Sequence, residues 1–323
     1  QRQMCIRDSS ANKDNNCNKY GIFAEINYSN IMDRVSNRQT TWYLINIKAR
    51  REQTTEHYVQ VFRNLYEQDP LVGFPRGGKS GSLKYVTYSN LLDENGNPNW
   101  IQIGLLSYTI IDPEAFYNKR SREDVTMDNW NEDIVANKKE TDLYFIPSVH
   151  TLAVKCNSDI SLKNIVFYLS EALNRVEPDT FDVDVIIERD ILERILNAHV
   201  VTHLYANISY SNPGHTRGFE AAFDRKLREM GASRIEFTAT GSKEYPLNSE
   251  DDGMLQSIVN LSEQNGYVQA TIQSTENAKL EKIDSSEHPR KLVVPQIVND
   301  VCSTIYNTIT VSYTHLRAHE TSA

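Results

Sequence analysis

Apolar residues recur along the chain with two periods, and each period predicts a different element. A period of three to four residues from about Thr55 predicts a helix that stops at Asp69-Pro70, because proline cannot donate the next backbone hydrogen bond. Ser161 or Asp159 can cap a second helix, whose apolar stripe runs to Val176. Further helices are predicted at residues 190–197, 219–230 and 249–265, and strands at 20–29, 41–49, 83–89, 100–110, 142–148, 150–156, 181–187, 199–211, 233–239, 267–273 and 279–284.

Short strands interleaved with helices indicate an α+β fold with mixed or antiparallel sheets and packed helices. We expect two β-α-β-β-type halves, ferredoxin-like in character, that divide near residues 189–200. The expected organisation is an artefactual or disordered stretch at 1–19, an N-terminal half at 20–190, a C-terminal half at 191–290 and a partly artefactual tail at 291–323. The first half includes a long charged loop near 112–142, which has little periodicity.

The two ends of the chain differ from the rest of the sequence. The strings QRQMCIRDS and VSYTHLRAHETSA resemble translated sequencing adapters, and neither has a helix or strand period that continues into its neighbour. We therefore expect residues 1–9 and 311–323 to be dispensable for folding.

Composition narrows the class of protein. The chain has 323 residues, 39% of them hydrophobic, and a formal charge of −9. It has no apolar run long enough for a transmembrane helix and no apolar N-terminal signal, so we expect no membrane partner. An acidic balance disfavours non-specific nucleic-acid binding but leaves room for a local basic surface. Outside the end strings, Cys17, Cys156 and Cys302 are far apart and form no CxxC pair, which favours a reducing, cytoplasmic compartment.

The order of segments resembles one bacterial family. From about Thr41 to Pro289 the chain is similar to the family catalogued as domain of unknown function 4747, and the most specific pieces are FIPSVHTLAV, ISYSNP, NGYVQA and SSEHP, in that order. This family has no established activity. Some members are associated with bacterial anti-phage defence, so the resemblance implies such an association for this chain.

One segment matches the GxxxxGK[ST] phosphate-loop pattern, at Gly73 to Ser80 with Lys79 as the lysine. A phosphate loop needs a strand before it and a helix after it, so that the helix N-terminus points at the anion. Here a predicted helix precedes the segment and a predicted strand follows it. We therefore interpret it as a flexible glycine-rich loop, with nucleotide binding as the weaker alternative.

Two carboxylates form the only chemically suggestive pair. Asp182 and Asp184 lie two residues apart on one strand, so they share a face and can converge on a divalent ion. The alternative is that they form the solvated polar face of a half-buried strand, whose other face is apolar. We favour this second interpretation, which predicts that neutralising both aspartates hardly changes stability.

Histidines and basic residues give no clear site. His199 and His203 have HxxxH spacing, but a strand would separate them too far to share a zinc ion. His150 and His288 could each act as a base, but neither has a recognisable partner. The basic residues are interpreted as solvated faces, and the alternative is that together they form a phosphate-contacting patch. They lack the aromatic interleaving of a single-strand binding platform: Lys48, Arg50 and Arg51 after one strand, and Arg217, Arg225, Lys226 and Arg228 near one helix.

These patterns favour a soluble binding or regulatory protein with a protein or nucleic-acid partner, within anti-phage defence if the resemblance holds. We expect no cofactor and no metal, and no catalytic constellation is visible. The first alternative is a metal-dependent phosphodiesterase or nuclease that uses Asp182 and Asp184; the second is nucleotide binding around Lys79. A third carboxylate or a histidine within ligand distance of the aspartate pair would favour the nuclease.

Overall fold

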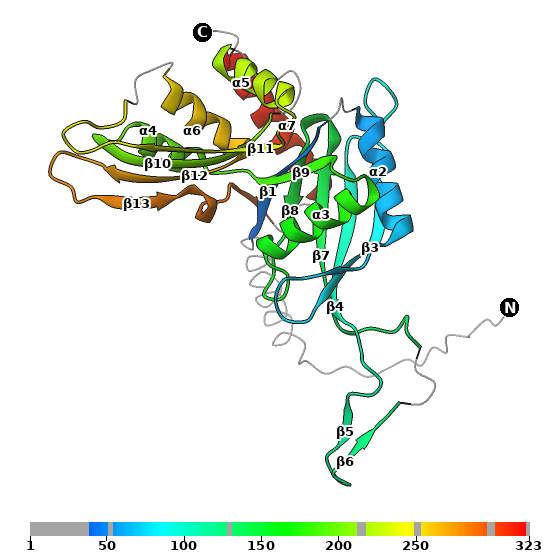
Figure 1. Ribbon diagram of the computed structural model, residues 1–323. Helices are drawn as coiled ribbons and strands as arrows, with labels where there is room; N and C mark the ends of the chain where they lie inside the picture. Colours follow the sequence, from blue (N-terminus) through cyan, green and yellow to red (C-terminus); the bar gives the residue numbers. More distant parts are fainter. Residues whose placement is uncertain are drawn as a thin grey trace, which may run out of the picture.

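The computed structural model describes residues 39–50, 54–127, 131–211, 218–248, 253–295 and 301–320, with an α+β fold of antiparallel sheets and packed helices (Figure 1). The first sheet contains β1 (Gln39–Ala49), β2 (Val72–Gly73), β3 (Ser80–Tyr88), β4 (Ile101–Thr109), β7 (Ala136–Ile146), β8 (Thr151–Val154), β9 (Phe181–Val185) and β14 (Lys291–Pro295). The second contains β10 (Val200–Ser209), β11 (Arg234–Thr240), β12 (Gly266–Gln273) and β13 (Glu281–Asp284). The helices are α2 (Thr55–Gln68), α3 (Leu162–Val176), α4 (Arg189–Leu196), α5 (Gly218–Glu229), α6 (Met254–Asn265) and α7 (Val301–Glu320).

The first sheet is organised around β1. Its strand order is β14-β1-β8-β7-β4-β3-β2, and β9 and β14 follow one another along the same edge of β1. The strands β9-β1-β8-β7, with α2 and α3 as their connections, have the β-α-β-β-α-β order of a ferredoxin-like unit, into which β2, β3 and β4 are inserted.

The second sheet is arranged differently. Its order is β11-β10-β12-β13, and β10 pairs antiparallel with β11, the strand that follows it after α5. A ferredoxin-like unit would place another strand between the first two, so this sheet does not have the arrangement expected for the second half. The strand predicted at 199–211 is confirmed as β10, and Leu204, Ala206 and Ile208 form its buried apolar face.

The predicted ends of α2 and α3 are accurate because specific residues cap them, whereas the helix predicted at 249–265 begins at Met254 after Gly253, and its predicted start lies outside the described residues. The Thr54 side chain accepts a hydrogen bond from the His57 backbone N–H at the start of α2, and Asp69 adopts a left-handed conformation after its end. Ser161 caps α3 in the same way as Thr54 caps α2. The apolar stripe predicted for α2 is the face that it buries, and it consists of Tyr58, Val61, Phe62 and Leu65.

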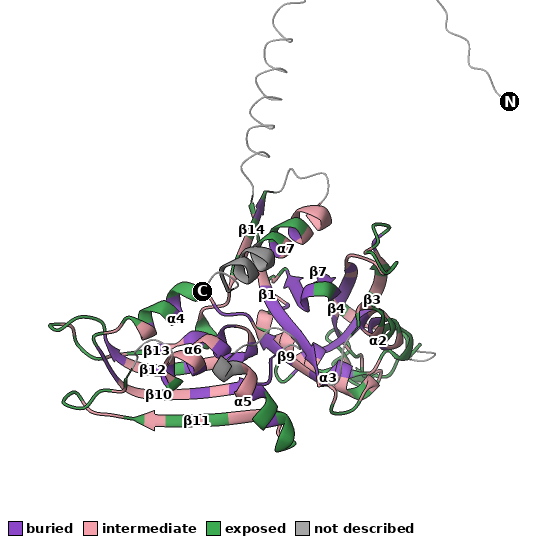
Figure 2. Cartoon of the chain, turned by 90° about the horizontal axis from the view of Figure 1, so that it is seen from above, coloured by how far each residue is buried: buried purple, intermediate pink, exposed green. Residues whose placement is uncertain are grey.

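The two faces of β1 bury against different elements. Ile45 and Ile47 point into the core under α2 and α3, whereas Trp42 and Leu44 point into a second core with Ile305 of α7. The next residues on the Trp42 face are Asn46 and Lys48, which are polar and fully or almost fully buried. Figure 2 shows β1 and β9 as largely buried where the two sheets meet.

Two segments differ from the sequence-based expectation. The charged loop expected near 112–142 contains a projecting hairpin, β5 (Phe116–Asn118) and β6 (Glu123–Val125), and the first part of β7. The tail expected after residue 290 contributes β14 to the first sheet and α7 to its second core, and α7 continues to Glu320 through the adapter-like string. The strand predicted at 20–29 lies outside the described residues. In the part of the chain that the structure describes, no helix has the length and apolar character needed to cross a membrane.

A substitution at Gly266, the first residue of β12, tests this arrangement. Its φ is 143°, and a Cβ at this position would lie 1.9 Å from the Asn207 carbonyl oxygen of the paired strand. Gly266→Ala should therefore lower the free energy of unfolding by about 2 to 5 kcal/mol in a denaturant titration. Gly73→Ala is the control, because nothing lies within 4 Å of the added Cβ. Equal stability of the two variants would contradict the β10–β12 register.

Candidate functional site

The charged residues of β1 and β9 meet where the first sheet contacts the second. Asn46 lies opposite Asp184 and Lys48 lies opposite Asp182 in the antiparallel register of the two strands. Because side chains alternate along a strand, these four residues share one face. That face is covered by α6 and by the ends of β10 and β11.

Asp184 is the centre of this polar cluster. Its Oδ2 lies 2.9 Å from Lys48 Nζ, and its Oδ1 accepts a hydrogen bond of 2.6 Å from Arg234 Nη2. Lys48 is fully buried and Asp184 is 6% exposed, whereas Arg234 is 31% exposed. Lys48 and Asp184 belong to the first sheet and Arg234 to the second, so the carboxylate joins the two sheets.

The second half supplies the remaining partners of Lys48. Its Nζ donates to Ser209 Oγ at the end of β10 and, over 3.1 Å, to Asn265 Oδ1 at the end of α6. With Asp184, the ammonium group therefore has three acceptors for its three protons. Ser209 Oγ lies 2.8 Å from Asp184 Oδ2 and 3.1 Å from the Asn265 carbonyl oxygen, so its proton has two possible acceptors. Asn46 Nδ2 adds a 3.0 Å hydrogen bond to the Gln264 carbonyl oxygen.

The charges determine the protonation of the cluster. Burial by itself would raise the pKa of Asp184, but Lys48 and Arg234 together lower it to about 2. Burial lowers the pKa of Lys48, and Asp184 opposes that shift. Because three acceptors surround Nζ, we assign Lys48 as charged. Ser209 is fully buried and within the network, so it is not an accessible nucleophile.

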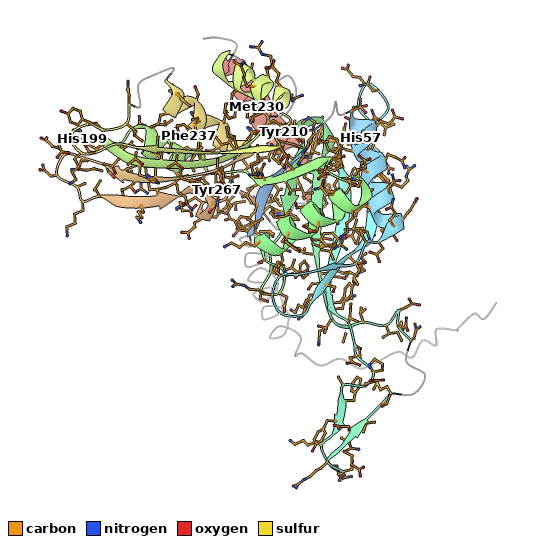
Figure 3. All side chains as sticks on the ribbon, in the orientation of Figure 1. His57, His199, Tyr210, Met230, Phe237 and Tyr267 are labelled. Atoms are coloured by element: carbon orange, nitrogen blue, oxygen red, sulfur yellow. The ribbon has the colours of Figure 1, made fainter. Side chains whose placement is uncertain are left out.

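Three polar atoms beside this network have no hydrogen-bond partner among the described residues: Arg50 Nε, Asp182 Oδ2 and Tyr210 Oη. Arg50 Nε and Asp182 Oδ2 are 3.7 Å apart, a loose ion pair. Burial, then the charge of Asp182 and a hydrogen-bonding interaction with it, raise the pKa of the Tyr210 hydroxyl, so it stays protonated. Tyr210 is 3% exposed and lies where the second sheet meets the first (Figure 3). We call these three residues the open triad.

Cations surround the open triad. The Arg228 guanidinium lies 5.5 Å from the centre of the Tyr210 ring, and Lys48 Nζ lies 5.8 Å from it. Burial raises the pKa of Asp182, while Lys48 opposes the shift and Asp184 reinforces it. The triad thus combines a guanidinium donor, a carboxylate acceptor and a phenol.

The expectation that Asp182 and Asp184 form a solvated face is wrong. The two aspartates do share the polar face of the strand, but the second sheet covers that face. Asp184 is therefore buried in ion pairs, and Asp182 is only 12% exposed. Lys48, expected on a solvated face, is fully buried for the same reason. Within the described residues, no group of three or more His, Cys, Asp or Glu side chains could hold a metal ion. Both Asp184 oxygens already have cationic partners.

The glycine-rich segment closes a hairpin. Gly73 pairs with Ser80 between β2 and β3, and the Phe74 N–H donates to the Lys79 carbonyl oxygen over 2.8 Å. Lys79 Nζ lies 3.4 Å from Asp159, and no helix N-terminus follows the segment, because Ser80 begins β3. This geometry does not support the nucleotide-binding alternative.

The histidines do not assemble into a site. His199 is exposed before β10, while His203 Nδ1 lies 3.3 Å from Thr240 Oγ1. His150 is buried, with its Nδ1 2.9 Å from Tyr58 Oη, and follows a turn of 3₁₀ helix at Pro147–Val149. His288 is partly exposed after a second such turn at Ser285–Glu287.

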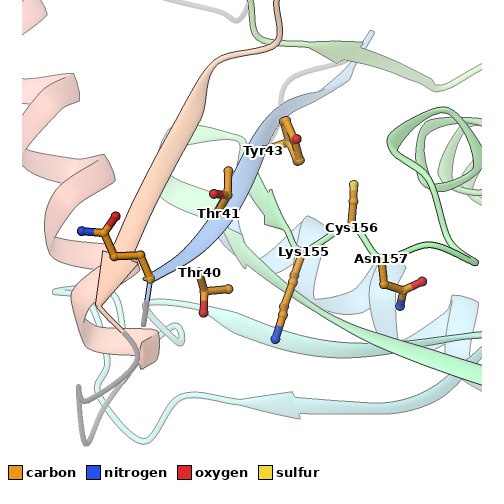
Figure 4. A pocket seen from close by; sticks show the side chains of 7 residues that line it. Thr40, Thr41, Tyr43, Lys155, Cys156 and Asn157 are labelled. Carbon is orange, nitrogen blue, oxygen red and sulfur yellow. The ribbon is translucent and has the colours of Figure 1, made fainter. Parts of the chain in front are cut away.

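A shallow polar hollow of about 420 Å³ lies elsewhere on the first sheet, between the start of β1 and the chain after β8 (Figure 4). Its one thiol belongs to Cys156, and burial raises the pKa of that thiol to about 11. The thiol is therefore protonated at neutral pH and is a poor nucleophile. The hollow is lined by Gln39, Thr40, Thr41, Tyr43, Lys155, Cys156 and Asn157.

Sequence reasoning missed the contributions of Ser209, Arg234, Asn265 and Tyr210. One signal was present: in β1 the Trp42 face changes from apolar to polar at Asn46 and Lys48 in mid-strand. A lysine in the middle of a strand that is otherwise apolar indicates either solvent or a buried counter-ion.

A family model described as Domain of unknown function (DUF4747) matches residues 38–310, so the chain belongs to this family. No curated protein matches the sequence.

Asp184→Asn tests the structural role of the network. Lys48 and Arg234 would lose their common counter-ion, so the free energy of unfolding should fall by about 3 to 5 kcal/mol at neutral pH. Glu140→Gln is the control, because it removes an exposed 2.6 Å pair with Lys84 and should leave the melting temperature unchanged. An Asp184→Asn protein as stable as the wild type would show that the ion pairs do not hold the sheets.

The pH dependence of stability follows from the lowered pKa of Asp184. Its contribution is complete above the unfolded-state pKa of about 3.9 and disappears as the pH falls through about 2. The stability advantage of the wild type over Asp184→Asn should therefore shrink by about 2 to 3 kcal/mol between about pH 5 and pH 2. Asp182 is present in both proteins, but the charge of Asp184 contributes to its raised pKa, so the difference also includes the change at Asp182. An advantage that does not change with pH would contradict this assignment.

Lys79→Ala tests the hairpin interpretation. It removes only a partly exposed, 3.4 Å pair with Asp159 and should leave the melting temperature unchanged. We expect no ATP–magnesium binding in isothermal titration of either protein. Micromolar binding by the wild type that disappears in the variant would overturn this interpretation.

Proposed function

We propose that this member of the DUF4747 family is a non-catalytic binding or regulatory protein, whose ligand contacts the open triad of Arg50, Asp182 and Tyr210. The observation that carries the proposal is the contrast between neighbouring polar groups. Lys48, Asp184 and their partners meet one another's hydrogen-bonding needs. The three buried polar atoms of the triad make no hydrogen bond of normal geometry among the described residues, and they interact only loosely with one another. Each such atom costs about 1 to 3 kcal/mol, a cost that a ligand would remove.

The triad favours a ligand with a donor and an acceptor side by side. Arg50 Nε donates, Asp182 Oδ2 accepts, and the Tyr210 hydroxyl can do either. A carboxamide or a peptide group has this pattern, so a protein segment fits the triad. The metal-dependent alternative has no supporting observation, because Asp184 is held by two cations.

The setting that we propose is bacterial anti-phage defence, which rests on the family resemblance. A cytoplasmic location is consistent with cysteine usage, since neither Cys156 nor Cys302, the cysteines within the described residues, forms a disulfide.

Tyr210→Phe is the sharpest test, because it removes only the hydroxyl beside Asp182. Stability should be unchanged or slightly higher, while protection of expressing cells in a phage plating assay should fall at least ten-fold. Tyr168→Phe is the matched control, since Tyr168 also has a buried hydroxyl without a partner but lies in the core of the first sheet. Equal protection by Tyr210→Phe and wild type would contradict the triad as the ligand site.

Asp182→Asn separates binding from catalysis. The purified wild type should not cleave duplex or single-stranded nucleic acid in the presence of magnesium or manganese. Cleavage that Asp182→Asn abolishes at an unchanged melting temperature would overturn the non-catalytic proposal and support the nuclease alternative.

A further inference from the structure

The β5–β6 hairpin forms an arm that projects from the first sheet, away from the second sheet (Figure 1). An isolated two-stranded hairpin gains little stability from its own contacts. The tip is nevertheless ordered by Asn118, whose Oδ1 accepts from the N–H groups of Arg120 and Ser121 at 2.9 and 3.1 Å. The Arg122 N–H donates to the Asn118 carbonyl oxygen over 2.7 Å and closes the turn.

The tip carries three cations in four residues. Lys119, Arg120 and Arg122 are all exposed, and none forms an ion pair with another described residue. The lysines at the base of the arm differ, because Lys138 and Lys139 lie within 4 Å of Glu140 and Asp159. The positive charge at the tip is therefore available to an external anion.

We infer that this arm is a nucleic-acid contact, with Lys119, Arg120 and Arg122 on the phosphate backbone. A two-stranded ribbon has dimensions that the major groove of duplex DNA admits. Guanidinium groups match phosphate oxygens in geometry as well as in charge. Tyr117 precedes the cations and is 60% exposed, so an aromatic ring is available beside them.

Acidic residues limit the contact to the tip. Glu123 and Asp124 lie on β6, opposite Asn118 and Tyr117, and the whole chain has a charge of −9. These charges repel a nucleic-acid backbone from the stem and the body. We therefore expect about three phosphate contacts, with a slope of log K against log salt of about −2.7 on duplex DNA.

This inference does not rest on the open triad, which lies at the junction of the two sheets. Tyr210→Phe should leave nucleic-acid binding unchanged, so failure of one proposal is distinguishable from failure of the other.

The test is fluorescence anisotropy with a labelled 20-base-pair duplex, and in parallel with a single strand of the same length. The full chain should bind the duplex, the single strand or both with a Kd between about 1 and 100 µM at low salt. Lys119→Gln/Arg120→Gln/Arg122→Gln should weaken that binding at least ten-fold without changing the melting temperature. The matched control, Arg225→Gln/Lys226→Gln/Lys282→Gln, removes three exposed cations elsewhere and should change it less than three-fold.

Three results would overturn the inference. One is no binding of either nucleic acid at 100 µM protein, and another is an equal loss of binding in the arm and control variants. The third is arm-dependent binding to vesicles of anionic lipid with no binding to nucleic acid, which would identify the arm as a membrane contact.

Discussion

The fold depends on one carboxylate that is shared between two sheets. Asp184 lies on β9 of the first sheet, where Lys48 of β1 binds one of its oxygens and Arg234 of β11, in the second sheet, binds the other. A buried ion pair of this kind adds little net stability over an apolar substitute, but the loss of one member leaves charges buried without a partner. The network therefore specifies how the sheets meet more than it stabilises them.

This constraint explains the chemistry of the junction. The residues that resemble a catalytic set, a lysine beside a serine and two aspartates, are used to join the two halves, and Ser209 and Lys48 are inaccessible to solvent. The polar atoms left open belong to Arg50, Asp182 and Tyr210, at the margin of the network. A ligand could bind the open triad without disturbing the network of Lys48 and Asp184, whose polar groups already have partners. The β5–β6 arm lies at the other end of the first sheet and is a separate surface.

Local structure could be predicted from the sequence wherever a single segment determines it. Thr54 and Ser161 begin helices through side-chain hydrogen bonds to nearby backbone N–H groups, and Pro70 follows the end of α2. The alternation in β9 separates Phe181 and Val183 from the two aspartates. What lies against a face depends on residues far away in the chain. The partners of Asp184 are 136 positions before it, at Lys48, and 50 positions after it, at Arg234. The alternation within β9 identifies its polar face but does not show that the second sheet covers that face. The arm was missed because its strands have three residues each, too few for a period.

The central claim is that Asp184 and Arg234 couple the two sheets energetically. A double-mutant cycle with Asp184→Asn, Arg234→Gln and the combined variant, measured by urea denaturation at neutral pH, tests it directly. We predict a coupling free energy of about 1 to 3 kcal/mol, as for residues in one buried charge network. Additive effects, with a coupling below about 0.5 kcal/mol, would show that the carboxylate does not link the sheets and would contradict the account.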